Sequence, residues 1–332
     1  MNTEKETKKF HINIHVVLIA IILIIFGISA YKLIMWNRGE AIILDPNEDT
    51  SEFDVEVLDE ILPLTNSQAE GHVYDDETSI LVLGNGTLSF TRDIEGGFAD
   101  KIALAADATV YNGAFPYISL ATRNLAMIEQ NYPDDIYSLS YIADAICTGD
   151  FSEMDRVTET YHYDGNYTQE AVQTLKSVDY DNLDVIVIMY DAQDYFAGRS
   201  IQNPNDDEER CTYVGSLKYA VRQIQKTYPY IRIIVMSMFY TEGFNEDGSS
   251  YDPDVIDVGN GTISNYVYNQ LQACSELSVS FVDNFYGTIN QNNYSDYIYY
   301  EDGTDYIHIN DAGQQLLANR LANVIKKFPN DK

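Results

Sequence analysis

Basic residues are scarce in this chain. Its 332 residues include 20 Lys and Arg against 52 Asp and Glu, which gives a formal net charge of -32 at pH 7. Nucleic acids and anionic membrane surfaces are bound through clusters of Lys and Arg, because both carry dense negative charge. The composition therefore argues against nucleic acid as a partner and predicts an exposed, highly solvated surface.

Cysteine and histidine are also few, and their spacing excludes the common metal sites. Cys147, Cys211 and Cys274 are an odd number and lie far apart, with no C-x-x-C pair, so neither a disulfide framework nor a zinc site is indicated. His72 and His162 stand in polar stretches without metal-ligand spacing. The phosphate-binding and dinucleotide-binding glycine motifs are absent as well. We therefore expect no metal and no cofactor.

Long hydrophobic runs are limited to one, near the N-terminus. Residues 15–36 read HVVLIAIILIIFGISAYKLIMW, with no charge between Val16 and Tyr31. With its flanks the run reaches the ~20 residues that span a bilayer, and no A-x-A cleavage site follows it. This predicts a cytoplasmic tail at 1–14, an uncleaved transmembrane signal anchor at 15–36, the cell membrane as a partner, and the rest of the chain outside. A segment buried in a folded core is the alternative.

An acidic stretch separates this run from the first strong strand pattern. Residues 37–78 contain many acidic residues and few apolar runs, so we interpret them as a linker, with a short helix at 55–62 as an option. The domain then extends over 79–328. It begins with the continuous apolar run Ile80–Leu83, which predicts a buried strand, and the turn Gly84-Asn85-Gly86.

Strand and helix patterns alternate through the domain. The strands are expected at 80–83, 108–111, 185–189, 231–236 and 279–282. The helices are expected at 94–106, 118–130, 169–177, 213–228, 259–276 and 311–328, with helix and loop mixed over 133–165. Such alternation predicts an α/β fold with a mostly parallel sheet covered on both faces, and continuous apolar strands agree with it. In such folds the chemistry lies beyond the carboxyl ends of the strands.

The turn before the last helix holds a histidine with a carboxylate three residues earlier. Asp305-Tyr306-Ile307-His308 is followed by Ile309-Asn310-Asp311-Ala312-Gly313 and an amphipathic helix. A carboxylate on one imidazole nitrogen fixes the tautomer and leaves the other nitrogen to act as a base. A surface turn with a capping Asn or Asp and a structural histidine is the alternative.

Over 79–328 this order of motifs resembles the SGNH or GDSL-like hydrolases. The resemblance implies a three-layer α/β/α, flavodoxin-like domain. It also implies a nucleophilic Ser in a Gly-Asp-Ser turn after the first strand, and a Gly and an Asn that help to form the oxyanion hole. The Asp-x-x-His pair before the last helix matches best, and by this resemblance His308 is the general base and Asp305 its orienting partner.

The other family positions depart from the pattern. Gly86 stands at the serine position beside Asn85, and Gln193 replaces the Asn of the third motif, while Asp194 keeps its Asp. After the second strand Gly113 is a glycine candidate for the oxyanion hole. Tyr117 stands at the position where the family usually has a later glycine. Glycine cannot form an acyl-enzyme, since it has no side-chain oxygen. Thr87, one residue later, is the candidate nucleophile, and activation of water by His308 is the alternative.

Two functions follow from these features. The first is a membrane-anchored, extracytoplasmic esterase or acyltransferase acting on ester-linked acyl groups, with acetyl groups of surface carbohydrate as the expected substrate and a bacterial surface as the expected setting. The alternative is a catalytically inactive SGNH-fold protein that binds glycan or serves in assembly, because Gly86 and Gln193 both depart from the catalytic pattern. No feature of the sequence specifies a protein partner.

Overall fold

The computed structural model describes residues 57–75, 77–123, 132–160, 167–245, 247–300 and 307–329, together with Ile22, Phe26 and Gly27. The chain divides into two compact units, Met1–Asp54 and Val55–Lys332. Apart from those three positions, the predicted membrane segment lies outside the described residues. Among the described residues there is no helix with the length and apolar character needed to cross a membrane.

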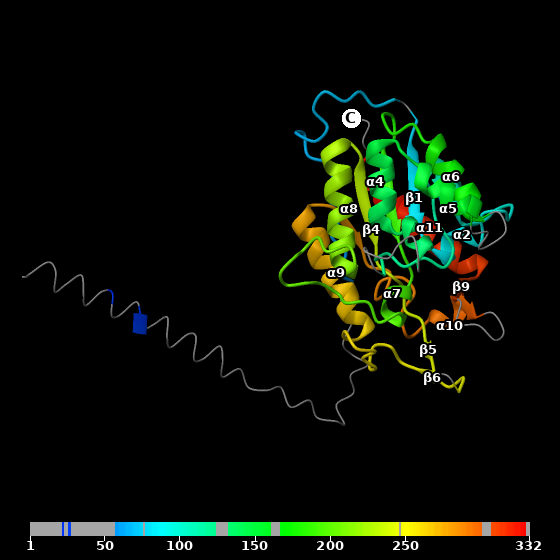
Figure 1. Ribbon diagram of the computed structural model, residues 1–332, viewed down its shortest axis with the longest axis vertical. Helices are drawn as coiled ribbons and strands as arrows, with labels where there is room; N and C mark the ends of the chain where they lie inside the picture. Colours follow the sequence, from blue (N-terminus) through cyan, green and yellow to red (C-terminus); the bar gives the residue numbers. More distant parts are fainter. Residues whose placement is uncertain are drawn as a thin grey trace, which may run out of the picture. The chain divides into compact units, whose positions relative to one another are not determined.

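A five-stranded parallel sheet forms the centre of the second unit (Figure 1). Its spatial order is β2-β1-β3-β4-β7. The strands are β1 (Ser79–Gly84), β2 (Thr109–Asn112), β3 (Val185–Met189), β4 (Arg232–Met236) and β7 (Ser280–Val282). The predicted α/β class with a parallel sheet is confirmed. Since β1 lies between β2 and β3, the chain changes direction across the sheet at β1, which is where flavodoxin-like folds place their ligands.

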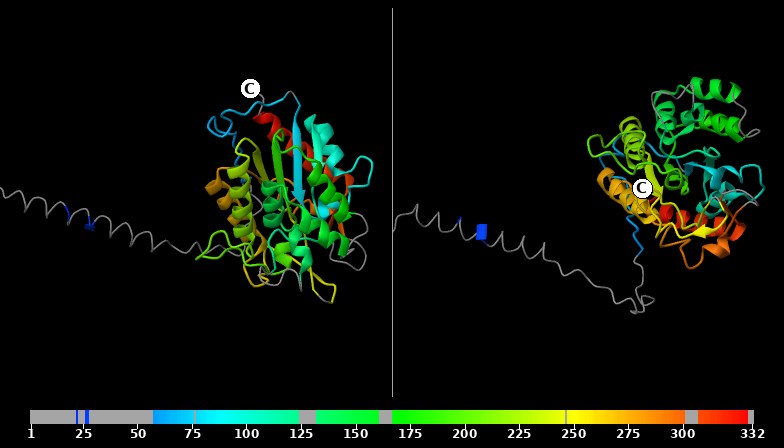
Figure 2. Two further views of the ribbon diagram at one scale, coloured as in Figure 1. Left: turned by 45° about the horizontal axis from the view of Figure 1, so that its top comes forward. Right: turned by 60° about the horizontal axis from the view of Figure 1, so that its bottom comes forward.

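Helices cover both faces of this sheet, so the unit has three layers (Figure 2). Side chains alternate along each strand: Leu81 and Ile186 face one apolar cluster, whereas Ile80 and Val187 face the other. The first cluster is closed by α4 (Leu139–Thr148), α5 (Ser152–Thr160), α6 (Tyr167–Ser177), α8 (Tyr213–Thr227) and α9 (Ile263–Leu277). The second is closed by α3 (Phe98–Ala106) and α11 (Asp311–Lys327). Burial on both faces explains the continuous apolar strands.

Short elements surround the carboxyl ends of the strands. The helical ones are α2 (Gly86–Ser89), a 3-10 turn at Pro133–Tyr137, α7 (Gln193–Phe196) and α10 (Tyr294–Tyr297). Two antiparallel pairs complete the set, β5 (Gly243–Phe244) with β6 (Ser250–Tyr251), and β8 (Ile298–Tyr300) with β9 (Ile307–Ile309). The sequence analysis did not predict these pairs, because two or three residues give no measurable alternation.

One expectation differs from the structure in the region after β2. The helix predicted at 118–130 is absent over 118–123, and the remainder lies outside the described residues. The backbone amides of Leu120 and Ala121 instead donate to the carboxylate of Asp194, at 2.7 and 3.0 Å, and Thr122 donates to the carbonyl of Arg210. These tertiary hydrogen bonds hold the segment as a buried loop and outweigh its helical periodicity.

Part of the predicted linker belongs to the domain. Glu60 pairs with Phe281 in an antiparallel bridge, and the amides of Leu58 and Leu62 donate to the side chains of Asp283 and Ser280. The segment therefore covers the outer edge of β7, which would otherwise expose unpaired backbone groups. The predicted domain start at residue 79 is thus too late, and residues 57–62 contain one isolated bridge and no helix.

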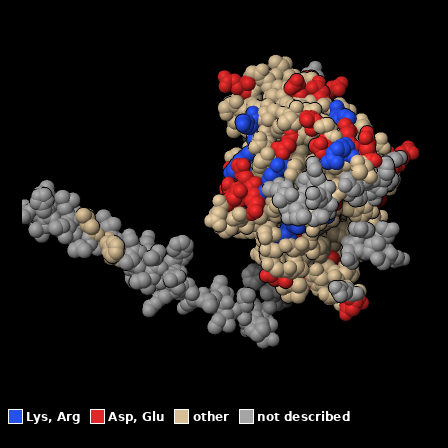
Figure 3. Space-filling view, viewed as in Figure 1, with Lys and Arg blue, Asp and Glu red and all other residues tan. Residues whose placement is uncertain are grey.

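Acidic side chains are spread over the face shown in Figure 3, with basic ones beside them. Lys218 contacts Glu276 and lies 3.8 Å from Asp207. Arg222 pairs with the same Asp207 at 3.1 Å and with Glu208 at 2.5 Å. The cations on this part of α8 are therefore neutralised by neighbouring carboxylates.

Candidate functional site

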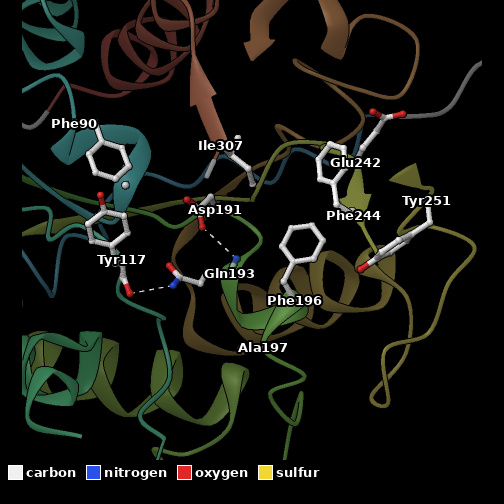
Figure 4. Close-up of a pocket in the computed structure, with 12 residues that line it drawn as sticks. Phe90, Tyr117, Asp191, Gln193, Phe196, Ala197, Glu242, Phe244, Tyr251 and Ile307 are labelled. Atoms are coloured by element: carbon white, nitrogen blue, oxygen red, sulfur yellow. Dashed lines mark hydrogen bonds between the residues drawn. The ribbon is translucent and has the colours of Figure 1, made fainter. Parts of the chain in front are cut away.

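A pocket of about 370 Å³ lies at the carboxyl ends of the central strands (Figure 4). It is bounded by α2, the loop after β2, α7, the β5–β6 pair and the start of β9. Its lining residues are Gly86, Phe90, Tyr117, Asp191, Gln193, Phe196, Ala197, Glu242, Gly243, Phe244, Tyr251 and Ile307. The sequence predicted a site at this edge of the sheet, and Gly86 and Gln193 are the predicted residues that line it.

The position expected for the nucleophile faces an aromatic ring. Gly86 begins α2 directly after β1, and a Cβ added to it would lie 2.7 Å from Cε2 of Phe90. The Phe90 ring in turn lies 5.1 Å from the ring of Tyr117 and 5.1 Å from that of His308, measured between centroids. The space in front of Gly86 is therefore occupied by a side chain that also packs against the predicted base.

The hydroxyl of Thr87 lies outside this pocket. The Thr87 side chain is buried, and its Oγ1 has no hydrogen-bond partner among the described residues. Ser89, the more distant hydroxyl on α2, is fully buried and donates to the carbonyl of Gly86. Among the described residues neither hydroxyl is hydrogen-bonded to His308, so the assignment of Thr87 as nucleophile stays a prediction.

His308 lies on β9 rather than on a turn. It pairs with Tyr299 of β8, and the two rings stack at 5.2 Å with an interplanar angle of 16°. Phe90 packs against it from α2. Asp305 lies outside the described residues, so its pairing with His308 stays a prediction.

The candidate oxyanion donors are engaged in the fold. The amide of Gly113 donates to the carbonyl of Val82 at 2.9 Å, and a Cβ there would meet Leu175 at 2.8 Å, so Gly113 lies in the core rather than in the site. The side-chain amide of Gln193 donates to the carbonyl of Tyr117 at 3.0 Å. Tyr117 has a φ of 57°, which is the left-handed conformation that a glycine would adopt at lower cost.

Asp191 is the functional candidate that the sequence analysis missed. Its Oδ1 accepts hydrogen bonds from Asn85 Nδ2 at 2.7 Å and from the Gln193 amide at 3.1 Å, while its own amide donates to Asn85 Oδ1 at 3.0 Å. Burial raises the pKa of Asp191 to about 6, although the hydrogen bonds from Asn85 and Gln193 act in the opposite direction. The available signal was its place two residues after the end of the most apolar strand.

Asn85 and Asp194 hold the walls of the pocket. Asn85 is fully buried, and its Nδ2 donates to the carbonyl of Ile118 at 3.1 Å as well as to Asp191. It therefore links the loop after β2 to the loop after β3. Asp194 holds the loop after β2 through the amides of Leu120 and Ala121. Burial also raises the pKa of Asp194 to about 6. Among the described residues no group of three or more His, Cys, Asp or Glu side chains is arranged to hold a metal ion.

Comparisons with known proteins were made with both sequence and structure. No protein-family model and no curated protein matches the chain. One solved structure superposes with a TM-score of 0.52 at 18% identity, covering 76% of this chain and 97% of the other. A structure described as a GDSL-like lipase from Bacteroides ovatus gives 0.45 at 11% identity, covering 76% and 100%. A carbohydrate acetylesterase from Sinorhizobium meliloti gives 0.43 at 12% identity, covering 76% and 99%.

These similarities concern the fold. The superposition with a TM-score of 0.52 shows that the chain shares its α/β fold with a solved protein, and the SGNH or GDSL-like resemblance stated from the sequence stays an expectation. The activity is a separate matter, because one fold carries many functions and function depends on the residues of the site.

Proposed function

We propose that this domain binds a carbohydrate in the pocket without hydrolysing an ester. The contact between Gly86 and Phe90 carries the proposal. Ester hydrolysis through an acyl-enzyme needs a side-chain nucleophile within hydrogen-bond reach of its base. Glycine supplies none, and the Phe90 ring takes the space next to it.

The state of the oxyanion position supports the same proposal. A well-placed oxyanion donor contributes about 2.7 to 4 kcal/mol to the transition state of acyl transfer. The Gln193 side-chain amide donates to the carbonyl of Tyr117, so one of its two hydrogens holds the loop after β2 and is not available to an oxyanion. Two of the groups that acyl transfer requires are therefore replaced by structural contacts.

The lining of the pocket suits a sugar. Ligand pockets are mostly apolar, with a few polar groups that fix orientation, and have volumes of about 300 to 1,000 Å³. This pocket has aromatic side chains at both ends, Phe90 and Tyr117 at one and Phe244 and Tyr251 at the other (Figure 4). Aromatic faces can stack on pyranose rings, while Asp191 and Gln193 lie where hydroxyl groups would be bound.

Binding and acetate release measured on the same samples test this proposal. The full-length chain is titrated with a panel of bacterial surface polysaccharides and their acetylated forms. We expect binding without acetate release, and weaker binding by Tyr251→Ala. Tyr268→Ala is the matched control, because Tyr268 is an exposed tyrosine on α9 and does not line the pocket. Equal loss in both variants, or no binding by the unmodified chain, would contradict the proposal.

Ester hydrolysis or acyl transfer is the second candidate. It is favoured by the place of His308 beside the pocket lining, 5.1 Å from the Phe90 ring, and by Asp191, a pocket carboxyl whose pKa near 6 suits a general base. In this form the protein would remove or transfer acetyl groups on surface carbohydrate, with Thr87 or water attacking the ester. Acetate release that His308→Ala abolishes would establish it, and the same assay on Thr87→Ala would then separate the two nucleophiles.

We also propose that residues 15–36 anchor the protein in the cell membrane with the second unit outside. The uncharged run in the sequence supports this placement. Protease added to intact cells should then digest an epitope placed at the C-terminus but spare one at the N-terminus. Protection of both epitopes would contradict the proposed orientation.

A further inference from the structure

The Asp191 carboxylate has no positively charged neighbour among the described residues. Burial raises its pKa and two hydrogen bonds lower it, from the Asn85 side chain and the Gln193 amide, and no lysine or arginine contributes. The side chain is 8% exposed, and both hydrogen bonds fall on Oδ1. Oδ2 is thus the oxygen left for a ligand in the pocket that Asp191 lines.

The rest of the lining favours a positive charge. Of the described residues that bound the pocket none is lysine or arginine, whereas Glu242 is a second acidic residue among them. Phe90, Tyr117, Phe196, Phe244 and Tyr251 supply aromatic rings. The faces of such rings attract cations within about 6 Å, and rings arranged around a cavity are the usual receptors for organic ammonium groups. A buried carboxylate is stabilised most by a partner that carries a positive charge and donates a hydrogen bond.

We propose that the pocket recognises an organic ammonium group carried by an amino sugar, with Asp191 as its counter-ion and the aromatic side chains around it. This inference rests on the proposed carbohydrate binding and specifies its ligand class. A metal ion fits less well, because the described residues form no group of three ligands. A neutral sugar would leave the Asp191 charge buried and uncompensated.

The test compares four probes that differ in charge and in sugar content. Methyl glucosaminide, methyl N-acetylglucosaminide, methyl glucoside and choline are titrated calorimetrically into the full-length chain at about pH 7, where an aspartate with a pKa near 6 is mostly ionised and the amine of the amino sugar is still mostly protonated. We expect methyl glucosaminide to bind at least about ten-fold more tightly than either of the two neutral sugars.

Two substitutions at opposite ends of β3 separate a local contact from general attraction. Asp191→Asn and Asp184→Asn each remove one buried carboxylate and change the net charge equally, but Asp184 precedes β3 and binds Ser79 outside the pocket. Asp191→Asn should weaken methyl glucosaminide binding about ten-fold to a hundred-fold. Asp184→Asn should leave it unchanged. Equal loss in both would overturn the assignment of Asp191 as counter-ion.

The probes also distinguish the two proposals from each other. If methyl glucoside binds as tightly as methyl glucosaminide, the ammonium inference falls and carbohydrate binding stands. If choline binds with Asp191 dependence while no sugar binds, an ammonium site stands and carbohydrate binding falls. If none of the four binds, both fall.

A second variant keeps the inference testable if Asp191→Asn fails to fold. Phe244 lies on the short β5–β6 pair and lines the pocket, so Phe244→Leu removes an aromatic face and leaves the carboxylate in place. Loss of one cation–aromatic contact should weaken methyl glucosaminide and choline about two-fold to five-fold. Neutral methyl glucoside should be affected less, and an equal effect on all probes would count against the ammonium site.

Discussion

Replacing Asp191 by asparagine should stabilise this protein at neutral pH. The Asp191 side chain is only 8% exposed and has no countercharge among the described residues, so ionisation is unfavourable in the folded state. An asparagine can keep its Oδ1 where Asn85 and the Gln193 amide donate, and turn its amide group toward the pocket. The substitution therefore removes the charge and preserves both hydrogen bonds.

The size and the sign of the effect follow from the pKa of Asp191. Burial raises it from the ordinary 3.8 to about 6. Between these values the folded protein holds a proton that the unfolded chain releases, so the stability due to this group is complete below pH 3.8 and is lost as the pH rises through about 6. The full difference corresponds to about 3 kcal/mol. Asp191→Asn should thus gain up to about 3 kcal/mol above pH 6 and nothing below pH 4.

Asp194 provides the matched contrast, because burial raises its pKa to about 6 as well. Here both oxygens accept backbone amides, Oδ2 from Leu120 and Oδ1 from Ala121. The side-chain NH2 of an asparagine would face one of these two backbone N–H donors, which would then have no acceptor. An unsatisfied buried donor costs about 1 to 3 kcal/mol of stability. Asp194→Asn should therefore gain less than Asp191→Asn at neutral pH and be less stable than the unmodified chain at about pH 4.

Chemical denaturation of the full-length chain, followed by circular dichroism from about pH 4 to pH 8, measures these differences. The curves of the unmodified chain and Asp191→Asn should meet at low pH and separate through about pH 6. A constant difference at every pH would refute the reasoning, because it would show that the Asp191 charge does not limit stability. Destabilisation of Asp191→Asn at about pH 8 would refute it too.

Three further substitutions test other contacts. Gly86→Ser alone should not produce an esterase toward nitrophenyl acetate, since its Cβ would lie 2.7 Å from the Phe90 ring, and activity in this single variant would contradict the proposed blockage. Arg232→Met should lower the free energy of unfolding by about 3 kcal/mol, because the buried guanidinium donates only to backbone carbonyls at the end of α11 and at Leu62; an unchanged melting temperature would contradict this. Tyr300→Phe removes the hydroxyl that accepts from the Glu242 amide, so sugar binding should weaken several-fold in calorimetry while melting changes little.

The central sheet could be predicted from sequence because its strands are buried on both faces. A strand of this kind is a continuous apolar run, and Val185–Met189 matches β3 residue for residue. Long helices were similarly readable, since Thr212 and Asn310 cap α8 and α11 at the predicted starts. Local pattern and tertiary structure agree in these elements.

The walls of the site could not be predicted in the same way. The residues at 118–123 lack helix because Asp194, far along the chain, captures their amides. The β5–β6 and β8–β9 pairs are too short for a period, so the positions of Phe244, Tyr251 and His308 depend on contacts between distant segments. Asp191 had the right place in the sequence, but its significance comes from burial beside Asn85, which only the fold shows.

The contacts at the positions that the resemblance assigns to catalysis agree with the proposed binding site. A Cβ at Gly86 would lie 2.7 Å from the Phe90 ring, so a nucleophilic side chain at this position would require the ring to shift. Gln193 is longer than the expected asparagine, and the extra reach brings its amide to the carbonyl of Tyr117. The raised pKa of Asp191 indicates that its charge is unfavourable in the folded state at neutral pH, and strongly shifted pKa values of this kind are typical of functional sites. Asp191→Asn should therefore raise stability but weaken ligand binding. Substitution of a residue with a purely structural role would change stability and binding in the same direction.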